Sequence, residues 1–325
     1  MFLEVRYDKF MTDLEKSILA TLVYYDVLDQ PLTGWEVFKY LIKKGNLGQV
    51  KPKKIIDLLE ASPLISQKNG FYFLKGRQKI IKQRIARQGI ADHKWKKAKR
   101  MVKLLQQIPF IRLVMVSGSL AMDNPKEKSD IDLLIVTKAG RIWTCRGLTT
   151  LFIHCLGQRR HGLLAKDRFC LNHYLTNQSL KMPFPSLYNA QTYAHLVPIW
   201  QAEPGLYKKF QRANQWLKKY LVFYPAGQKG YLKKIKDNRF FTFLRKFRES
   251  ILDKKVGDGV EFILRKIQAR RINPYQPGGR VVFDDKQLEF HPDSPEKWIL
   301  ERYNQKMKEL GLAELGQEKD SGLTI

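Results

Sequence analysis

Two neighbouring stretches of sequence decide the expected fold: Val116-Ser117-Gly118-Ser119-Leu120-Ala121-Met122 and, after a polar loop, Ser129-Asp130-Ile131-Asp132-Leu133-Leu134-Ile135-Val136. An apolar run precedes the Gly-Ser pair, and a second, nearly continuous apolar run follows the first aspartate. Such runs are typical of buried strands. We therefore expect a strand at 110–116, a turn into a short helix, and a second strand at 131–137.

The polar residues of these stretches predict a metal–phosphate site. Residues two apart in a strand share a face, so the carboxylates of Asp130 and Asp132 should project side by side. Paired carboxylates suit Mg²⁺, which binds one or two of them together with substrate phosphates. Gly118 would let the backbone approach a phosphate, next to the free amides of a helix start. Ser119 is suited to cap that helix while its hydroxyl contacts a phosphate oxygen.

This arrangement resembles the polymerase-β nucleotidyltransferase superfamily, whose signature is a Gly-Ser pair, a loop, and Asp-x-Asp or Asp-x-Glu in an apolar strand. The resemblance implies a nucleoside triphosphate bound through Mg²⁺ or Mn²⁺. An acceptor hydroxyl attacks the α-phosphorus, and pyrophosphate leaves. Carried over by position, Gly118, Ser119 and Ser129 would bind the nucleotide, while Asp130 and Asp132 would bind the metal and be catalytic.

The resemblance spans residues 111–175 and departs from the family pattern in the next predicted strand, 168–175. The family takes a third carboxylate from that strand, but here the position holds Asn172, or His173 one residue later. A carboxamide oxygen can ligate a metal, yet it carries no charge and cannot act as a base. Asn172 is therefore the expected third ligand. With Asn172 at this position, the domain could be an active transferase, an enzyme with different chemistry, or a domain that binds nucleotide without turnover.

Residues 1–75 are expected to form a winged-helix-like domain. Two capping boxes, Thr12–Glu15 and Thr33–Glu36, predict two helix starts. A third helix is expected over 52–60, and Asn-Gly within Lys68-Asn69-Gly70 predicts a hairpin. Three helices followed by a hairpin resemble a winged helix-turn-helix, a fold that contacts either nucleic acid or protein.

The formal net charge of +28 predicts a polyanionic partner: nucleic acid first, an anionic membrane surface second. The excess lies in an expected connector helix over 76–108 and in residues 201–280. Arg159-Arg160-His161 could bind phosphate or favour a helix dipole. A merely solvated basic face is the alternative. The candidate nucleic-acid contacts are Lys51, Lys53, Lys54, Lys96, Lys97, Lys99 and Arg100.

The overall expectation is a mixed α+β fold in which a nucleotidyltransferase core, 109–182, is followed by a basic helical region, 183–325. Expected helices there cover 188–196, 207–223, 240–252 and 260–271, with a short hairpin at 281–283 and 288–290. The aromatics Trp216, Tyr220, Phe223 and Tyr224 could stack bases, but their helical spacing favours a core role. Arg239–Arg248 is basic and amphipathic and could lie on an anionic membrane. We expect it to pack on the transferase core.

The cysteine usage and the N-terminus predict a cytoplasmic protein. Cys145, Cys155 and Cys170 lack the paired spacing of a disulfide scaffold or a zinc site. No signal-peptide pattern and no apolar run of about 20 residues is present in the sequence.

These observations favour a nucleotidyltransferase that moves a nucleoside monophosphate to a hydroxyl of a nucleic acid, protein or small molecule. The alternatives are a nucleic-acid-binding regulator with a nucleotide-sensing or degenerate transferase domain, and a membrane-surface protein that uses its basic C-terminal helices.

Overall fold

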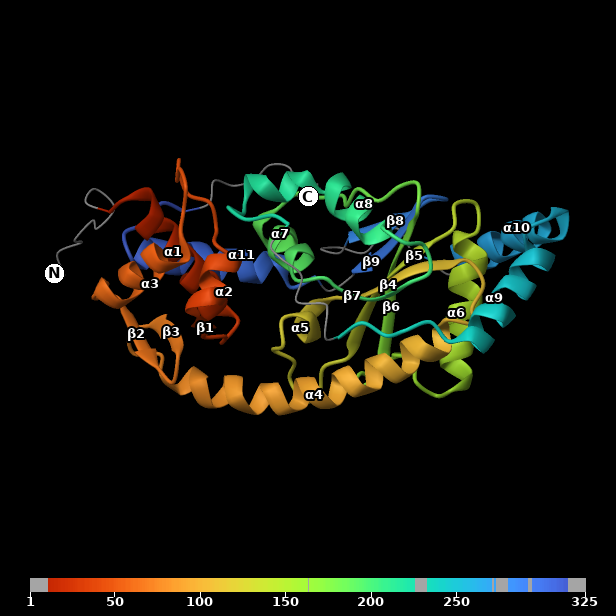
Figure 1. Ribbon diagram of the computed structural model, residues 1–325, viewed down its shortest axis with the longest axis horizontal. Helices are drawn as coiled ribbons and strands as arrows, with labels where there is room; N and C mark the ends of the chain where they lie inside the picture. The colour runs from red at the N-terminus through yellow and green to blue at the C-terminus, as the bar shows by residue number, and fades with distance from the viewer. Residues whose placement is uncertain are drawn as a thin grey trace.

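A six-stranded sheet in the order β7-β4-β5-β6-β9-β8 forms the centre of the structure (Figure 1). The structure is a computed structural model that describes residues 11–162, 164–225, 233–270, 272, 280–291 and 294–314. Strands β5 and β6 are parallel, and every other neighbouring pair is antiparallel. The strands are β4 Ile111–Val116, β5 Ile131–Thr137, β6 Phe169–Thr176, β7 Val197–Gln201, β8 Arg280–Phe283 and β9 Gln287–His291.

The three strands expected around the Gly-Ser and Asp-x-Asp stretches are confirmed, and so is the C-terminal hairpin. Strand β7, Val-Pro-Ile-Trp-Gln, was not expected, because this region was predicted to be helical apart from one hairpin. A proline cannot donate to a sheet ladder, but it is tolerated in an edge strand, which is where β7 lies.

Side chains of β5 alternate between two hydrophobic cores. Ile131, Leu133 and Ile135 belong to a core that includes Trp95 and Met101 of α4 (Lys79–Leu105), together with residues of α6 (Ile142–Cys155). Leu134 and Val136 belong to the other core, which includes residues of α7, α8 and α11. Those helices are α7 Leu187–Ala194, α8 Leu206–Ala213 and α11 Glu296–Glu309. The sheet is therefore covered on both faces, as its apolar sequence requires.

The N-terminal elements form a second, three-stranded antiparallel sheet, β1-β3-β2, beside three helices. Both capping boxes are confirmed, since each threonine hydroxyl accepts from its N3 amide and each glutamate accepts from the cap amide. The elements are α1 Asp13–Val27, β1 Leu32–Thr33, α2 Gly34–Lys39, α3 Pro52–Ala61, β2 Ile65–Lys68 and β3 Phe71–Leu74.

This N-terminal part shares one core with α7, α8 and α11. Tyr25 donates to Gln191 of α7 at 2.8 Å, and Arg84 of α4 pairs with the buried Glu36 of α2 at 2.8 Å. Residues 11–75 therefore pack against the rest of the chain rather than standing apart from it.

The region beyond residue 183 is not wholly helical, because it contributes three strands to the central sheet. The helix expected over 207–223 is α8 followed by a 3-10 turn, Gln215–Lys219. Tyr220 and Tyr224 are buried, and Trp216 and Phe223 pack against the same core, so the core role of these aromatics is confirmed. Two further helices are α9 Arg239–Leu252 and α10 Lys255–Ala269; α10 packs against α6, and α9 packs against α10.

Two of the expectations concern residues that the structure does not describe. These are the tail at 317–325 and the Pro- and Gly-rich loop at 273–280, apart from Arg280, which begins β8. Among the residues that are described, no helix has the length and apolar character needed to cross a membrane.

Candidate metal site

A glycine turn brings the end of β4 against the start of β5. The Ser117 amide donates to the Asp132 carbonyl at 3.0 Å, and Gly118 (φ +64°) begins the short helix α5, Gly118–Ala121. A Cβ on Gly118 would lie 2.3 Å from Asp132 Oδ2. Both the left-handed backbone and the adjacent carboxylate therefore require glycine here. The expected capping role of Ser119 is wrong: Ser117 is the N-cap, it makes no side-chain capping bond, and Ser119 lies inside the helix.

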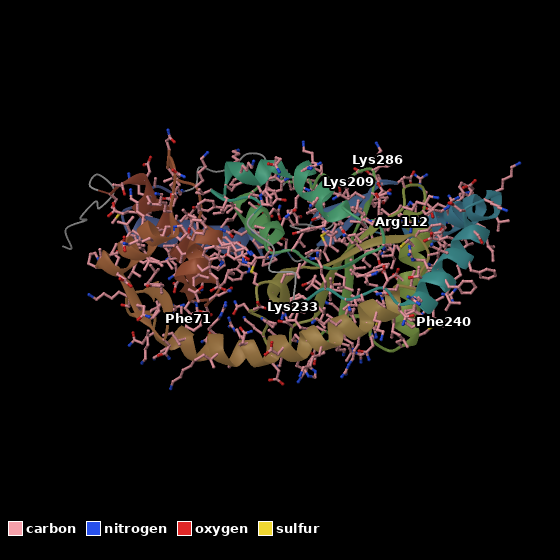
Figure 2. All side chains as sticks on the ribbon, viewed as in Figure 1. Phe71, Arg112, Lys209, Lys233, Phe240 and Lys286 are labelled. Atoms are coloured by element: carbon pink, nitrogen blue, oxygen red, sulfur yellow. The ribbon has the colours of Figure 1, made fainter. Side chains whose placement is uncertain are left out.

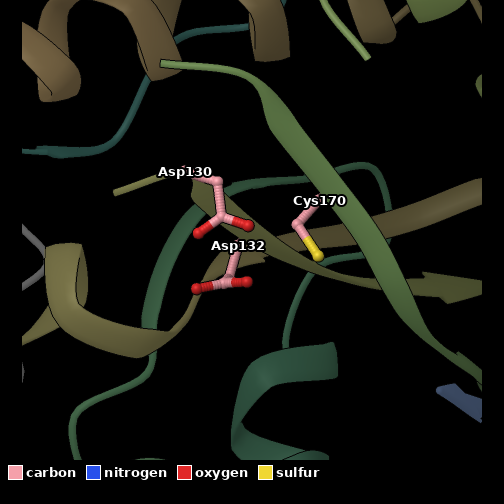
Figure 3. Close-up of side chains that lie close together, drawn as sticks. All are labelled: Asp130, Asp132 and Cys170. Atoms are coloured by element: carbon pink, nitrogen blue, oxygen red, sulfur yellow. The ribbon is translucent and has the colours of Figure 1, made fainter. Parts of the chain in front are cut away.

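The predicted carboxylates converge, with a cysteine as their third neighbour (Figure 3). One ligand atom each from Asp130, Asp132 and Cys170 lie within 4.8 Å of one another. Cys170 is the register partner of Asp132 on the parallel strand β6. A register shift follows, and Asn172, the expected third ligand, lines the same pocket as the two carboxylates. Cys170 is thus a further neighbour of the two carboxylates, which only the strand register identifies, and the ligand role expected of Asn172 stays a prediction.

Cys170 does not supply the missing charge. Burial raises the pKa of its thiol well above the usual range, and the neighbouring Asp132 carboxylate raises it further. At neutral pH the group is a neutral thiol, a soft ligand poorly matched to Mg²⁺. The hard ligands of this cluster are thus the two carboxylates.

The two aspartates have different electrostatic surroundings. Burial raises the pKa of Asp132 from 3.8 to about 7, and repulsion from the Asp130 carboxylate adds to the shift. Arg160 donates to Asp130 Oδ2 at 2.6 Å and lies 3.8 Å from Cys170 Sγ. Arg160 itself is 43% exposed. A partly exposed cation therefore sits over the rim of the site, where an anionic ligand can reach it.

A pocket of about 320 Å³ opens over the carboxylates. The Gly-Ser turn and the starts of β5 and β6 form one side, and α7 and the segment before α11 form the other. Its volume is within the range of small-molecule sites. Sequence reasoning did not identify the α7 wall, which consists of Tyr188, Asn189, Thr192 and Tyr193.

His173 is part of the same pocket wall. Its ring lies edge-on to Tyr193, with 6.4 Å between the ring centroids. On its other side, His173 Nε2 is 3.8 Å from Oε2 of Glu289, a fully buried carboxylate on β9. An imidazole is thereby held between the pocket and a buried acid.

Ser129, expected to bind nucleotide, does not line this pocket. Its hydroxyl accepts from the Lys126 amide at 3.0 Å, and its carbonyl accepts from Lys94 at 2.7 Å. Lys94 is buried and also pairs with Asp167. Ser129 therefore fixes the loop before β5 rather than facing a ligand.

The basic candidates lie in two places away from the pocket. Lys51, Lys53 and Lys54 are exposed at the start of α3. The other four lie on α4, where Lys96 and Arg100 are exposed and Lys97 and Lys99 are half-buried. A hollow of about 470 Å³ is lined by Lys96, Lys97 and Arg100, and an adjoining one of about 360 Å³ by Lys97, Lys166 and Arg168. Helix α4 packs on the sheet face opposite the carboxylates.

Comparison with models of known protein families, with curated proteins and with solved structures found no match for this chain. Its function must therefore be inferred from the site: two converging carboxylates, an adjacent glycine turn, and a pocket with a cationic rim and an aromatic wall.

We expect Asp132→Asn to stabilise the metal-free protein at pH 8 but not at pH 4. Because the folded state raises the pKa of Asp132 from 3.8 to about 7, the folded protein binds this proton more tightly than the unfolded chain does. That stabilisation is fully present below about pH 4 and is lost as the pH rises through 7. Removing the carboxylate should recover on the order of 1–3 kcal/mol at pH 8.

Urea unfolding of both proteins, with a chelator present, measures this difference. Asp92→Asn, at an exposed position on α4, is the control and should change the free energy of unfolding little at either pH. Parallel curves of stability against pH for wild type and Asp132→Asn would contradict the expectation.

Proposed function

We propose that this chain is a nucleotidyltransferase of the polymerase-β type. Asp130 and Asp132 would hold Mg²⁺ or Mn²⁺ with a nucleoside triphosphate, and a nucleoside monophosphate would pass to an acceptor hydroxyl as pyrophosphate leaves. The observation that carries this proposal is the packing of the Gly118 turn directly against the Asp132 carboxylate, beside Asp130 and at the mouth of a pocket.

The donor set fits this metal. Two hard oxygen ligands leave coordination positions for phosphate oxygens and water, which is how Mg²⁺ is usually bound beside a nucleotide. Burial, together with the neighbouring Asp130 carboxylate, raises the pKa of Asp132 to about 7, and a bound cation would favour the charged form. When bound, the metal would stabilise the negative charge of the transferring phosphoryl group.

The surrounding side chains suit the other parts of a nucleotide. The backbone of Gly118 and the hydroxyl of Ser119 line the pocket where phosphates would lie. Arg160 can contact a phosphate oxygen from the rim. Tyr188 and Tyr193 offer rings on which a base can stack.

A third carboxylate is not among the described residues of the pocket wall. His173 is the imidazole in that wall, and we propose that it accepts the proton of the acceptor hydroxyl. An imidazole is a common general base in enzymes, and the buried Glu289 behind it would stabilise the protonated form.

We further propose that the acceptor is a nucleic acid. The element order α1-β1-α2-α3-β2-β3, with sheet order β1-β3-β2, resembles that of a winged helix-turn-helix and supports this proposal. Its candidate contacts are the exposed Lys51, Lys53 and Lys54, while the hollow beside α4 presents Lys96, Lys97 and Arg100. A winged helix that contacts protein instead would leave α4 as the nucleic-acid surface.

A second candidate function is a nucleotide-sensing regulator. It is favoured by the pocket wall, whose described residues offer the neutral Cys170 thiol and the Asn172 carboxamide but no third carboxylate. Incubation with each labelled triphosphate and Mg²⁺ or Mn²⁺ separates the two candidates. Label on RNA or protein, with pyrophosphate release, supports transfer. Metal-dependent binding without transfer supports sensing, and the absence of binding contradicts both.

Charge reversal on α4 should reduce the salt dependence of nucleic-acid binding. Each lost phosphate contact lowers the slope of log affinity against log salt concentration by about one unit. The triple variant Lys96→Glu, Lys97→Glu, Arg100→Glu should therefore flatten the slope by about two to three units in the full-length chain. Filter binding over a salt series measures it.

The matched variant reverses three charges on α3 instead: Lys51→Glu, Lys53→Glu, Lys54→Glu. It produces the same change in net charge at the winged-helix surface. An unchanged slope in the α4 variant and a flattened slope in the α3 variant would assign the contact to α3. Unchanged slopes in both would mean that neither surface contacts nucleic acid.

A further inference from the structure

Helices α9 and α10 expose an unusual amount of apolar surface. Among the described residues, 16 large apolar side chains are exposed, and eight of them lie on these two helices. We call this set the hairpin surface: Phe240, Phe243, Phe247, Ile251, Val256, Phe262, Ile263 and Ile267. Contiguous apolar surface of this kind marks an interaction site. The expectation that Arg239–Arg248 packs on the core is wrong for Phe240, Phe243 and Phe247.

The exposed residues of α9 form one stripe. Their spacing, 240, 243, 247 and 251, places them on one helical face, opposite the buried Arg245. The rings of Phe243 and Phe247 stack with their centroids 6.4 Å apart. Figure 1 shows α9 and α10 side by side at one end of the molecule, and Figure 2 places Phe240 on that end. The apolar stripe thus faces away from the body of the protein.

The two helices are firmly attached through their acidic residues. Glu249 pairs with Arg112 of β4 at 2.8 Å, Asp253 with Lys138, and Asp258 with Arg141 at 2.7 Å. The fourth acid, Glu261, accepts from the Trp143 and Thr144 amides at the start of α6. Each of the four acids of α9–α10 and their connection is therefore held by the body.

Most basic residues of the same helices are exposed, whereas the acidic residues contact the rest of the protein. Those that are exposed are Arg239, Lys246, Lys254, Lys255, Arg265, Lys266 and Arg270. Lys266 lies over the Phe262 ring at 4.3 Å, and Arg265 is paired with Asp285. The outer surface of the hairpin therefore combines large apolar side chains with positive charge.

We propose that the hairpin surface binds the surface of a bilayer that contains anionic lipids. A basic amphipathic helix with aromatic and aliphatic residues on its other face lies at the headgroup boundary and buries its apolar side chains there. Nearby lysines and arginines add attraction to anionic headgroups. A second copy of this surface would bring like charges together, and nucleic acid would leave the aliphatic side chains in water.

Co-sedimentation of the full-length protein with vesicles tests the proposal. Binding is expected to vesicles of phosphatidylcholine mixed with phosphatidylglycerol and to weaken strongly for phosphatidylcholine alone. Phe243→Ser with Phe247→Ser should lower the affinity at least about tenfold, since two aromatic side chains lose their apolar environment. Both residues are exposed, so the fold should be retained. Ile85→Ser, at an exposed site on α4, is the matched control and should bind like wild type.

Three results would overturn the proposal. Wild type that stays in the supernatant with the mixed vesicles shows that the surface does not bind lipid. Equal vesicle binding by wild type and the double phenylalanine variant places the contact elsewhere. A wild-type oligomer in sedimentation velocity that the double variant dissociates shows that a second copy covers the surface. Nucleotide binding at Asp130 and Asp132 is measured separately in the same variants, so failure here leaves the proposed function untouched.

Discussion

Asp130→Asn and Asp132→Asn should each lower Mg²⁺-dependent triphosphate binding and turnover by at least about a hundredfold. The cluster offers two hard, charged ligands, and Cys170 beside them is a neutral thiol. A carboxamide is uncharged, so each substitution removes one of the two negative charges that the protein offers to the cation. The loss is large because the cation has few protein ligands. Binding of a fluorescent triphosphate analogue, with and without Mg²⁺, measures the loss directly.

The fold should tolerate both substitutions, so a loss of nucleotide binding can be assigned to the missing carboxylate. Asp132→Asn should stabilise the metal-free protein at pH 8, because burial disfavours the charged carboxylate. Glu127→Gln is the control, since Glu127 lies in the same loop and pairs with Lys166 at the surface. Folded Asp130→Asn and Asp132→Asn proteins that bind and turn over nucleotide like wild type would contradict the proposed function.

Local patterns in the sequence were sufficient for the secondary structure around the site. The apolar runs predicted β4, β5 and β6, and the two Thr-x-x-Glu boxes predicted the starts of α1 and α2. The capping interactions lie within three residues along the chain, and the strands are marked by the apolar runs that their burial requires. Strand β7 was missed because the region beyond residue 183 was predicted to be helical apart from one hairpin, and its proline is tolerated because the strand lies at the sheet edge.

The composition of the site depends on contacts that sequence spacing does not encode. Cys170 faces Asp132 because of the register of β5 and β6, and the register shift after that pair decides where Asn172 lies. The α7 wall, with Tyr188 and Tyr193, comes from a helix whose apolar pattern does not specify which pocket it covers. Pairwise tertiary packing, rather than local propensity, determines these positions.

The same limitation explains the outward phenylalanines of α9. An amphipathic sequence predicts that one helical face is buried, but it does not say against what. In the structure, the contact with the body is made by Arg245 and Glu249, while the phenylalanine stripe is exposed. Polar residues hold this helix on the sheet, so the apolar face remains available to a partner.

Gly118→Ala should reduce metal–triphosphate affinity by roughly ten- to a hundredfold, because displacing a binding group by about 1 Å can cost a hundredfold. The new Cβ would lie 2.3 Å from Asp132 Oδ2, so the carboxylate must move away from the turn and out of its present position. The left-handed backbone at φ +64° adds a strain of about 1–2 kcal/mol. Isothermal titration with Mg²⁺ and a non-hydrolysable triphosphate measures the affinity, and urea unfolding measures the strain.

Gly140→Ala separates the two effects. Gly140 also has a left-handed backbone, at φ +74°, but a Cβ added there would meet no group of the described residues within 4 Å. It should therefore show a similar loss of stability with no loss of affinity. If Gly118→Ala loses stability to the same extent as Gly140→Ala and still binds metal–triphosphate like wild type, then contact between the turn and Asp132 does not position the carboxylate. The packing of the Gly118 turn against the Asp132 carboxylate would then no longer support the proposed function.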